Sequence, residues 1–457
     1  MNAPVRQLGS ALTSQSLRPD GKRVKLHPAE SAGRYTGLQR WLYPVLILVY
    51  AALPWIRFHG EPLVFVDIEH RHFFFFGLAF NSSDFYLAFF VVSGIGFALI
   101  VLSALVGRVW CGYACPQTVF LEGVARRIET LVEGRPGARV ARERGPWTAG
   151  RAARFGLKHF LFVLSAFLIA NIFISYFASL DQVLRMARRP PLENWGAFLW
   201  MAAITGIIYF DFAWFREQIC VVICPYGRLQ SVLADRDTLI VGYDGLRGEP
   251  RARRGTVGAG DCVDCKRCVQ VCPTGIDIRN GLQLECVGCA HCVDACNEVM
   301  LKIGRPAGLI RYDSQAGLEH KPRRFLRPRL AGYAVAMVAG LVALTLAVSG
   351  RSAFGASLAR AQRAPYERVG DLVVNRFLLH VSNKGDAPRT LHLEYVLPTG
   401  ARVEGAMVDV PLQGFEQREI PFVVESLPGQ QGARSLTVRA TDGSGAHVES
   451  TVVLLGG

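Results

Sequence analysis

Long apolar stretches alternate with long polar stretches along the 457-residue chain. Five stretches carry no charge or almost none: 41–56, 85–107, 159–180, 195–210 and 330–350. A helix that spans a bilayer takes roughly 20 apolar residues, and about 17 suffice where flanking side chains snorkel. The pattern therefore predicts five transmembrane helices, of which the first and the fourth are short and depend on their neighbours.

After residue 350 the pattern changes to short segments in which apolar and polar residues alternate. The segments are LVVNRFLLHVSN, RTLHLEYVLP, EQREIPFVVESL, RSLTVRAT and HVESTVVLL, and turn sequences such as NKGD, PTG and DGSG separate them. Short strands at this spacing predict a C-terminal all-β immunoglobulin-like sandwich, without cysteines and so without a disulfide. It contains no catalytic constellation, which favours a structural or docking role.

Composition supports the membrane interpretation. Hydrophobic residues make up 51% of the chain and charged residues 19%, which is too apolar for an ordinary soluble enzyme. About 40 polar and basic residues precede the first apolar stretch, so no signal peptide is expected and the first helix should remain in the mature protein.

The positive charges predict an orientation. Lys and Arg concentrate before the first apolar stretch, after the second and before the fifth. Because positively charged loops stay inside, the N-terminus is expected in the cytoplasm and the C-terminal domain outside. The loop with Arg185, Arg188 and Arg189 fits less well, since it should lie outside. The net charge of +14 is then mainly a topology signal, and no nucleic-acid partner is expected.

All twelve cysteines lie between Cys111 and Cys296, in segments that the charge pattern places at the cytoplasmic side. In a reducing compartment such clusters indicate metal or redox sites rather than disulfides. The strongest pattern is CVDCKRCVQVCPTG, followed by CVGCAHCVDACN. In both, two, two and three residues separate successive cysteines.

This spacing is typical of bacterial two-cluster ferredoxins, in which the fourth cysteine of each repeat ligates the other cluster. The sequence therefore predicts two 4Fe-4S clusters with crossed ligand sets. One set is Cys262, Cys265, Cys268 and Cys296, and the other is Cys286, Cys289, Cys292 and Cys272. Zinc is the alternative for Cys-x-x-Cys pairs, but the third and fourth cysteines, repeated at the same spacing, disfavour it. Asn297 replaces the proline that often follows the last ligand.

Four cysteines lie outside these repeats, in WCGYACPQT and CVVICPYG. Each sequence follows an apolar stretch that runs toward the cytoplasm, and a four-residue spacing places two thiols on one face of a helix. The two pairs, Cys111 with Cys115 and Cys220 with Cys224, could therefore meet. Because soft thiolates select Cu(I), zinc or iron–sulfur, we interpret these four residues as a transient copper site with a catalytic role. A redox dithiol and buried small hydrophobic residues are the alternatives.

Other polar residues near the apolar stretches are weaker candidates. Asp211 is either functional or simply solvated at the membrane interface. Lys158 and His159 are interpreted as a snorkelling pair, with a quinone or metal pocket as the alternative. Three histidines of the first outer loop could bind metal, although an interfacial aromatic belt accounts for the neighbouring HFFFFG. They are His59, His70 and His72.

The expected fold is therefore mixed, a polytopic α-helical membrane protein with two added domains. Its parts are a cytoplasmic basic tail (1–40), a four-helix membrane domain (41–215), a cytoplasmic two-cluster ferredoxin domain (216–329), a fifth transmembrane helix (330–350) and an external immunoglobulin-like domain (351–457).

Several of these motifs together resemble one known family. WCGYACPQTVF, ICPYGRLQ, the ferredoxin repeats with CPTGIDIRNGLQLEC between them, and the β-rich tail are similar to the FixG (also RdxA or CcoG) family of cytochrome oxidase accessory proteins, over nearly the whole chain. The resemblance implies a multi-pass polyferredoxin of the bacterial inner membrane, with its C-terminal domain periplasmic. It also implies that the eight ferredoxin cysteines ligate clusters and that the four remaining cysteines handle copper.

The function that the resemblance implies is reduction of Cu(II) to Cu(I) during assembly of the cbb-type haem–copper oxidase, by a cupric reductase that acts as an assembly factor. The implied partners are copper, oxidase subunits or copper chaperones, membrane lipid, and a cytoplasmic electron donor or a quinol. One alternative is a quinol-oxidising electron conduit, like the ferredoxin-type membrane subunits of periplasmic nitrate reduction. Another is a non-redox copper carrier or assembly scaffold.

Overall fold

The computed structural model describes residues 25–58, 61–67, 72–76, 78–80, 84–178, 180–188, 190–361, 366–427 and 434–455. Contacts divide the chain into two compact units. The first comprises Met1–Leu53, Gly94–Ser175 and Ser179–Ala339, and the second Pro54–Ser93, Tyr176–Ala178 and Gly340–Gly457. His59, His70 and Arg189 lie outside the described residues.

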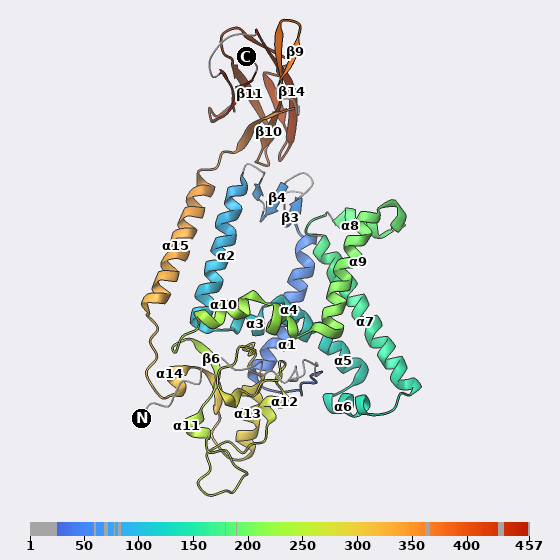
Figure 1. Ribbon diagram of the computed structural model, residues 1–457, viewed down its shortest axis with the longest axis vertical. Helices are drawn as coiled ribbons and strands as arrows, with labels where there is room; N and C mark the ends of the chain where they lie inside the picture. Colours follow the sequence, from blue (N-terminus) through green and yellow to red (C-terminus); the bar gives the residue numbers. More distant parts are fainter. Residues whose placement is uncertain are drawn as a thin grey trace. The chain divides into compact units, whose positions relative to one another are not determined.

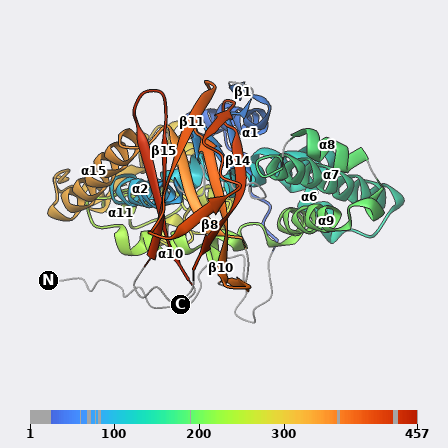
Figure 2. The same cartoon turned by 90° about the horizontal axis from the view of Figure 1, so that it is seen from above.

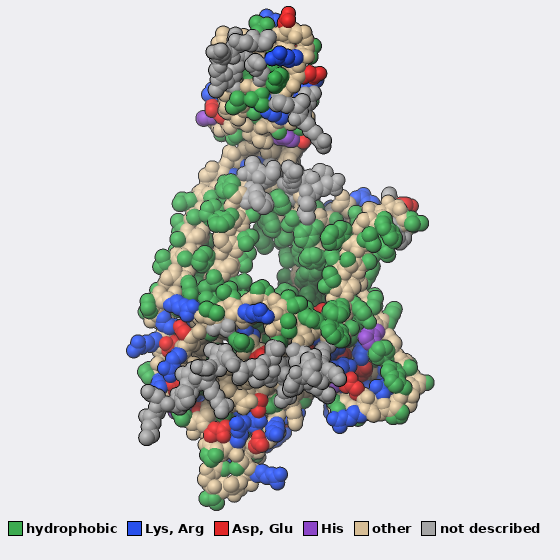
Figure 3. Space-filling view, viewed as in Figure 1, with side chains coloured by type: hydrophobic (Ala, Val, Ile, Leu, Met, Phe, Trp, Pro, Cys, Tyr) green, Lys and Arg blue, Asp and Glu red, His purple; other side chains and the backbone are tan. Residues whose placement is uncertain are grey.

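Four helices among the described residues are long and apolar enough to cross a membrane: Tyr86–Val106, Ala149–Ile174, Trp195–Phe215 and Pro328–Ser349. They belong to α2 (Phe85–Val106), α7 (Ala149–Ile174), α9 (Trp195–Phe210) with the π-helical turn η5 (Asp211–Phe215), and α15 (Pro328–Ser349). Helices α7 and α9 lie side by side (Figure 1 and Figure 2). Large apolar side chains such as Phe89 and Trp200 are exposed along these helices, as lipid contact requires. Figure 3 shows hydrophobic side chains over the surface of the helices. The protein is therefore a membrane protein.

Two of these helices are longer than their apolar stretches predict. Helix α7 begins at Ala149 rather than at residue 159, because the Thr148 hydroxyl accepts a hydrogen bond from the Arg151 backbone N at 3.3 Å and caps its first turn. The fourth stretch looks short as 195–210, but η5 continues it, and the span reaches 21 residues.

The first predicted span corresponds to α1 (Arg34–Ala52), which is not among the four. Its N-terminal half carries Arg34, Gln39 and Arg40, and the Gln39 side chain is almost fully buried against protein. The structure thus supports four spans, and the count of five remains a prediction.

The cysteine repeats lie in a small irregular part of the first unit. Strand β6 (Leu239–Tyr243) pairs antiparallel with β7 (Ile310–Ser314), and the helices α12 (Arg267–Gln270) and α13 (His291–Lys302) follow the cysteine loops. Lys266 and Ala290, at equivalent positions in the two repeats, both have left-handed backbones with φ of 56° and 61°. The two repeats therefore turn in the same way, as their common spacing predicts.

Short helices connect the part that contains the cysteine repeats to the membrane-spanning helices. They are α3 (Val109–Tyr113), α4 (Pro116–Phe120), the π-helix η3 (Leu121–Ala125), α5 (Arg126–Glu133), α6 (Pro136–Arg144), the π-helix η6 (Ile219–Ile223) and α10 (Pro225–Leu233). Further short helices are η1 (Leu53–Trp55), α8 (Leu180–Arg188), η4 (Pro191–Glu193), α11 (Gly245–Gly248), η7 (Ile278–Asn280) and α14 (Gln315–Leu318).

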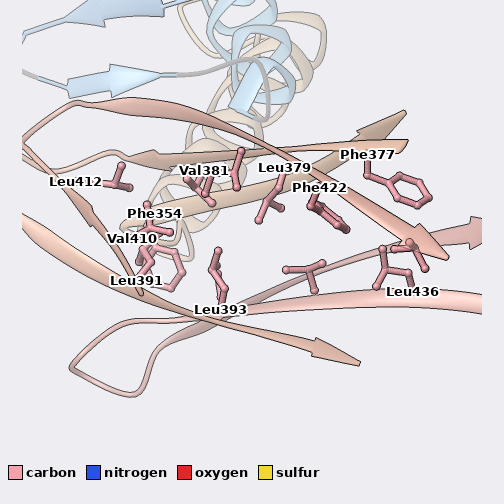
Figure 4. Close-up of a cluster of buried hydrophobic side chains, with 14 of the residues drawn as sticks. Phe354, Phe377, Leu379, Val381, Leu391, Leu393, Val410, Leu412, Phe422 and Leu436 are labelled. Carbon is pink, nitrogen blue, oxygen red and sulfur yellow. The ribbon is translucent and has the colours of Figure 1, made fainter. Parts of the chain in front are cut away.

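The C-terminal part of the second unit is a β-sandwich, which confirms the predicted immunoglobulin-like domain. One sheet has the order β12-β14-β10-β8, with β9 paired to β10, and the other has the order β13-β11-β15-β16. Alternate residues of both sheets meet in an apolar core that includes Phe377, Leu391 and Phe422 (Figure 4). The strands are β8 (Phe354–Arg360), β9 (Glu367–Val369), β10 (Leu372–Asn383), β11 (Arg389–Val396), β12 (Ala401–Glu404), β13 (Asp409–Leu412), β14 (Gln417–Ser426), β15 (Arg434–Thr441) and β16 (His447–Leu454).

The segment with HFFFFG also belongs to the second unit and forms short strands. They are β1 (Arg57–Phe58), β2 (Glu61–Pro62), β3 (Val64–Asp67), β4 (His72–Phe75) and β5 (Leu78–Phe80). Phe74 is buried against Phe65, and its ring lies 6.0 Å, centroid to centroid, from that of Phe415 in the sandwich. The aromatic-belt interpretation is therefore wrong for Phe74, whereas Phe76 is exposed.

Candidate functional site

Two small cavities lie among the cysteine repeats, in the part of the first unit from β6 to β7, which we call the iron–sulfur part. One is lined by Cys262, Cys265, Cys268 and Cys296, and the other by Cys272, Cys286, Cys289 and Cys292 together with Cys268. All twelve cysteines are described, and none is in a disulfide. Buried cavities walled by four thiols and apolar side chains suit 4Fe-4S clusters. The structure thus groups the residues as the crossed assignment requires, and the ligation of each cysteine remains a prediction.

The thiols of these cavities need a cation to ionise. Burial raises the pKa of Cys268 and of Cys296 to about 12, and neighbouring cysteines act in the same direction. A thiol with this pKa is protonated at neutral pH unless a positive metal centre favours the thiolate. The donor set therefore fits a bound cluster and does not fit a reactive free thiol.

The membrane-edge cysteines, defined as Cys111, Cys115, Cys220 and Cys224, do not lie on continuous helices. Helix α3 ends at Tyr113, and Cys115 is the N-cap residue of α4. Likewise η6 ends at Ile223, and Cys224 is the N-cap residue of α10. The following prolines disfavour helical backbone in the residue before them and are well suited to start a helix. The prediction of two pairs on helical faces is therefore wrong.

The four thiols nevertheless lie close together. Burial raises the pKa of the Cys220 thiol to about 12, and the other three thiols act in the same direction. Burial also raises the pKa of Cys111 to about 12, where Arg108 opposes it and Cys286 of the iron–sulfur part adds to it. Within the described part of the chain, no three Cys, His, Asp or Glu side chains are arranged to hold one metal ion. The thiols thus converge without forming a preformed mononuclear site.

Polar side chains hold the two membrane-edge segments together. Gln117 Nε2 donates to Asp211 Oδ1 at 2.9 Å and Oδ2 at 3.0 Å, and to the Arg216 carbonyl at 3.1 Å. Arg108 Nη2 donates to the Gly227 carbonyl at 2.5 Å. Asp211 is 7% exposed, so it joins the segments instead of being solvated.

The membrane-edge turn touches the loop of the second cysteine repeat directly. A Cβ atom on Gly112 would lie 2.8 Å from the Gly288 carbonyl oxygen, and one on Gly288 would lie 2.9 Å from the Arg108 carbonyl oxygen. Gly288 also has φ of 67°, which favours glycine. Only residues without side chains allow Cys111 and the Cys286–Cys289 loop to approach this closely.

Helix α1 also stabilises the contact between the Gly112 turn and the loop of the second cysteine repeat. Gln39 Nε2 donates to the Gly112 carbonyl at 3.0 Å and to the Cys289 carbonyl at 3.1 Å, while its Oε1 lies 2.6 Å from His291 Nε2. The Tyr43 hydroxyl donates to the Gly112 carbonyl at 2.7 Å. Sequence reasoning missed all of these residues except the cysteine. The glycines inside CGY and CVGC could have signalled a close approach, whereas nothing in the sequence marks Gln39.

Two of the weaker candidates, Lys158 and His159, make contacts within the protein. Lys158 Nζ donates to Glu133 Oε1 at 2.7 Å, and its side chain is only 5% exposed, so the snorkelling interpretation is wrong for Lys158. His159 Nδ1 lies 3.0 Å from the Tyr209 hydroxyl. His72 lies in β4.

Three family descriptions match parts of the chain. A 4Fe-4S dicluster domain matches residues 215–315, a 4Fe-4S binding domain matches residues 87–137, and the IG-like fold at the C-terminal of FixG matches residues 344–457. The first match contains both cysteine repeats, and the second contains Cys111 and Cys115.

Two curated proteins are similar over long segments. Protein RdxA of Cereibacter sphaeroides is 32% identical over 449 residues, which are 93% of this chain and 94% of that protein. Nitrogen fixation protein FixG of Rhizobium meliloti is 38% identical over 306 residues, which are 64% of this chain and 57% of that protein. A crystal structure of a FixG-related protein from Vibrio parahaemolyticus aligns with a TM-score of 0.22 and 19% identity, over 23% of this chain and 98% of that chain. The chain therefore belongs to the FixG/RdxA family of membrane proteins with 4Fe-4S clusters.

Proposed function

We propose that this chain is a membrane-bound electron-transfer protein that reduces Cu(II) to Cu(I) for the assembly of a cbb-type cytochrome oxidase. Iron–sulfur electron transfer in a membrane follows from the family; copper as the substrate is the proposed step. The observation that carries it is the convergence of the four membrane-edge thiols beside Cys286, with Gly112 packed on Gly288.

The residues suit this chemistry. When bound, 4Fe-4S clusters supply single electrons at low potential, and Cu(II) takes up one electron to become Cu(I). Thiolates prefer Cu(I) over Cu(II), so Cys111, Cys115, Cys220 and Cys224 would hold the reduced ion. Their buried thiols must lose protons when copper binds. Gly112 and Gly288 keep the segment of the membrane-edge cysteines in contact with the second cysteine repeat.

The proposed setting is the bacterial inner membrane, with the N-terminus and the iron–sulfur part in the cytoplasm and the sandwich in the periplasm. The basic segments before the spans support this orientation. Oxidase subunits or copper chaperones would take the Cu(I), and the sandwich, which has no cysteine, would serve as a docking domain for them.

The test is anaerobic and uses the full chain in detergent. The clusters are reduced with dithionite, excess reductant is removed, Cu(II) is added, and the iron–sulfur EPR signal is followed together with a Cu(I)-specific chelator. We expect one Cu(I) for each electron that the clusters lose. In the Cys220→Ser/Cys224→Ser variant we expect intact cluster signals without Cu(I) formation. Reduced clusters that ignore Cu(II) in the unaltered chain would refute the proposal.

One observation favours a second candidate function. The 4Fe-4S binding domain description includes Cys111 and Cys115, so the four membrane-edge cysteines could hold a third cluster in a quinol-oxidising electron conduit. Iron content separates the two functions. Two clusters contain eight irons per chain and three contain twelve. Eight irons, unchanged when Cys220 and Cys224 are replaced by Ser, favour the copper site; a fall from twelve to eight favours the conduit.

A further inference from the structure

The two cysteine repeats differ in what covers them. Cys265 and Cys289 occupy equivalent positions, and the residue after each, Lys266 or Ala290, has a left-handed backbone. Cys289 is buried, whereas Cys265 is exposed, and the other ten cysteines are buried or partly buried. The first repeat is therefore open to solvent at the position where the second is covered by protein.

The chain itself covers the second repeat. Gln39 of α1 donates to the Cys289 carbonyl at 3.1 Å, and a Cβ atom on Gly112 would lie 3.0 Å from Cys289 Cα. The covering segment leads directly to Cys111, where the proposed function uses the electrons. At the equivalent open position, Cys265 leaves room for a separate partner to approach the first repeat equally closely.

The cavities of the two cysteine sets also differ in their charge. Lys266, Arg267 and Arg279 line the cavity that contains Cys265. The described lining of the other cavity contains no Lys, Arg, Asp or Glu. Cys268 lines both cavities. The first set is thus the one with charged residues at its edge, and an electron accepted there has the second set as its neighbour.

The sequence around Cys265 carries an excess of positive charge. From Arg247 to Arg279 the chain has seven Lys and Arg residues and four Asp and Glu residues. Each of the four carboxylates is paired with an arginine. Arg279 alone binds two of them, Asp264 at 2.6 Å and Asp277 at 2.7 Å. The carboxylates are therefore already neutralised in part by neighbouring arginines.

Three of the basic residues are exposed, and no carboxylate in the described part of the chain pairs with them. They are Lys266, Arg253 and Arg254. The loop that carries the two arginines is attached to the first repeat, because the Ala252 backbone N donates to the Cys262 carbonyl at 3.3 Å. Exposed, unpaired positive charges beside an open cluster ligand favour a negatively charged partner.

We propose that this surface, the entry face of Cys265, Lys266, Arg253 and Arg254, docks a soluble one-electron carrier protein with an acidic surface around its iron–sulfur or flavin group. Transient electron-transfer complexes have small interfaces and gain specificity from charge. One electron leaves the reduced carrier, which is oxidised, and the cluster of the first cysteine set takes it up; no proton or leaving group is transferred. The inference deepens the proposed function by naming the class of donor, and it does not depend on the copper step.

The primary test is binding, measured without copper on the purified full chain in detergent. An acidic plant-type 2Fe-2S ferredoxin and a flavodoxin are the probes, and their affinity is measured by equilibrium titration at two salt concentrations. We expect salt to weaken binding and Lys266→Glu/Arg253→Glu to weaken it about tenfold or more. Zero-length carboxyl–amine crosslinks should map to Lys266. No binding of either probe, an unchanged affinity in the variant, or crosslinks confined to other lysines would overturn the proposal.

A matched variant controls for net charge. Arg135→Glu/Arg144→Glu reverses two exposed charges at the start and end of α6, outside the cysteine repeats, and should bind like the unaltered chain. Arg253→Glu/Arg254→Glu leaves the ligand loop intact and should weaken binding. All variants should keep their iron content and the EPR signals of the dithionite-reduced chain. An equal loss of affinity in the α6 variant would reduce the effect to unspecific attraction and overturn the proposal.

Dithionite separates this inference from the proposed function. The Lys266→Glu/Arg253→Glu variant should be reduced slowly by the carrier but fully by dithionite, and should then still form Cu(I). Cu(I) formation together with carrier binding that ignores the entry face would leave the copper proposal standing and refute the entry face. Carrier-driven cluster reduction that depends on the entry face, without Cu(I) formation, would refute copper and support the entry face.

Discussion

Gly112 is the residue at which the membrane-edge cysteines meet the second cysteine repeat. The Gly112→Ala change places a Cβ atom 2.8 Å from the Gly288 carbonyl oxygen, which forces two backbones apart. We expect both clusters to remain and Cu(II)-driven cluster oxidation to slow by about tenfold or more, since small displacements of reacting groups have large kinetic costs. Stopped-flow absorbance of the dithionite-reduced chain measures this rate.

Gly206→Ala is the matched control for this variant. Gly206 lies in α9, and a Cβ atom there meets nothing within 4 Å. The control should oxidise at the rate of the unaltered chain. Equal rates for Gly112→Ala and Gly206→Ala would show that the glycine contact does not govern electron transfer.

Glu129 is the central carboxylate of a buried ion cluster. It accepts hydrogen bonds from Arg139 and Arg216, and all three side chains are almost fully buried. Removing one partner of a buried ion pair leaves charge uncompensated and costs about 3–5 kcal/mol. Glu129→Gln should therefore lower the free energy of unfolding by about this amount in urea titrations in detergent. Glu298→Gln, which removes an exposed carboxylate paired with Lys302, should leave it unchanged.

The same carboxylate gives a pH dependence. Burial alone would raise the pKa of Glu129, but Arg216 and Arg139 outweigh it and lower the pKa to about 2. Because the folded pKa lies below the unfolded value of about 4.3, the stabilisation is complete above that value and is lost as the pH falls toward 2. Between pH 7 and pH 3, the unaltered chain should therefore lose more stability than Glu129→Gln does. Parallel pH profiles would contradict this.

Residues with local signals were predictable from the sequence, and residues with distant partners were not. The spacing of Cys262, Cys265 and Cys268 is a local property, so it predicts a ligand loop directly. Gln39 acts on Gly112 and Cys289, which lie 73 and 250 positions away. Its role depends on the fold, and an isolated glutamine near an apolar stretch gives no indication of it.

At the scale of elements, α1 is docked on the iron–sulfur part by its N-terminus. Asp294 Oδ2 of α13 accepts hydrogen bonds from the Thr36 backbone N at 2.7 Å and from Thr36 Oγ1 at 2.8 Å. A carboxylate at a helix N-terminus satisfies unpaired backbone donors and interacts favourably with the helix dipole. The same helix also carries Gln39 and Tyr43, so this cap positions the contact at Gly112.

Asp294→Ala should therefore loosen α1. We expect a loss of about 1 kcal/mol of stability, as for other helix caps, and faster hydrogen–deuterium exchange in residues 34–43. Glu298→Gln on the same helix is the control and should leave the exchange of α1 unchanged. Unchanged exchange in Asp294→Ala would mean that other contacts hold the helix.

Element types were predictable, but helix continuity was not. The apolar stretches located four spans, and the alternating tail located the sandwich, because burial imposes these periods on the sequence. The Cys-x-x-x-Cys spacing indicated a continuous helix, yet Pro116 and Pro225 start new helices after each pair. The proline signal was present in both motifs and outweighs the spacing, since proline restricts the residue before it.

At the scale of the whole molecule, the two termini lie on the same side or on opposite sides of the membrane according to whether α1 crosses it. An odd number of spans places the termini on opposite sides of the membrane, and an even number places them on the same side. The four apolar helices give an odd total only if α1 also crosses. Its C-terminal half, with exposed Val45, Leu48 and Val49, is apolar enough to enter lipid, while its N-terminal half is docked on protein.

We expect α1 to cross, with the N-terminus in the cytoplasm and the sandwich outside, because Lys and Arg concentrate on the side of the iron–sulfur part. Epitope tags at both termini and protease treatment of intact spheroplasts test this. The C-terminal tag should be removed and the N-terminal tag protected, and both should be removed after lysis with detergent. If both tags share one fate in intact spheroplasts, α1 does not cross.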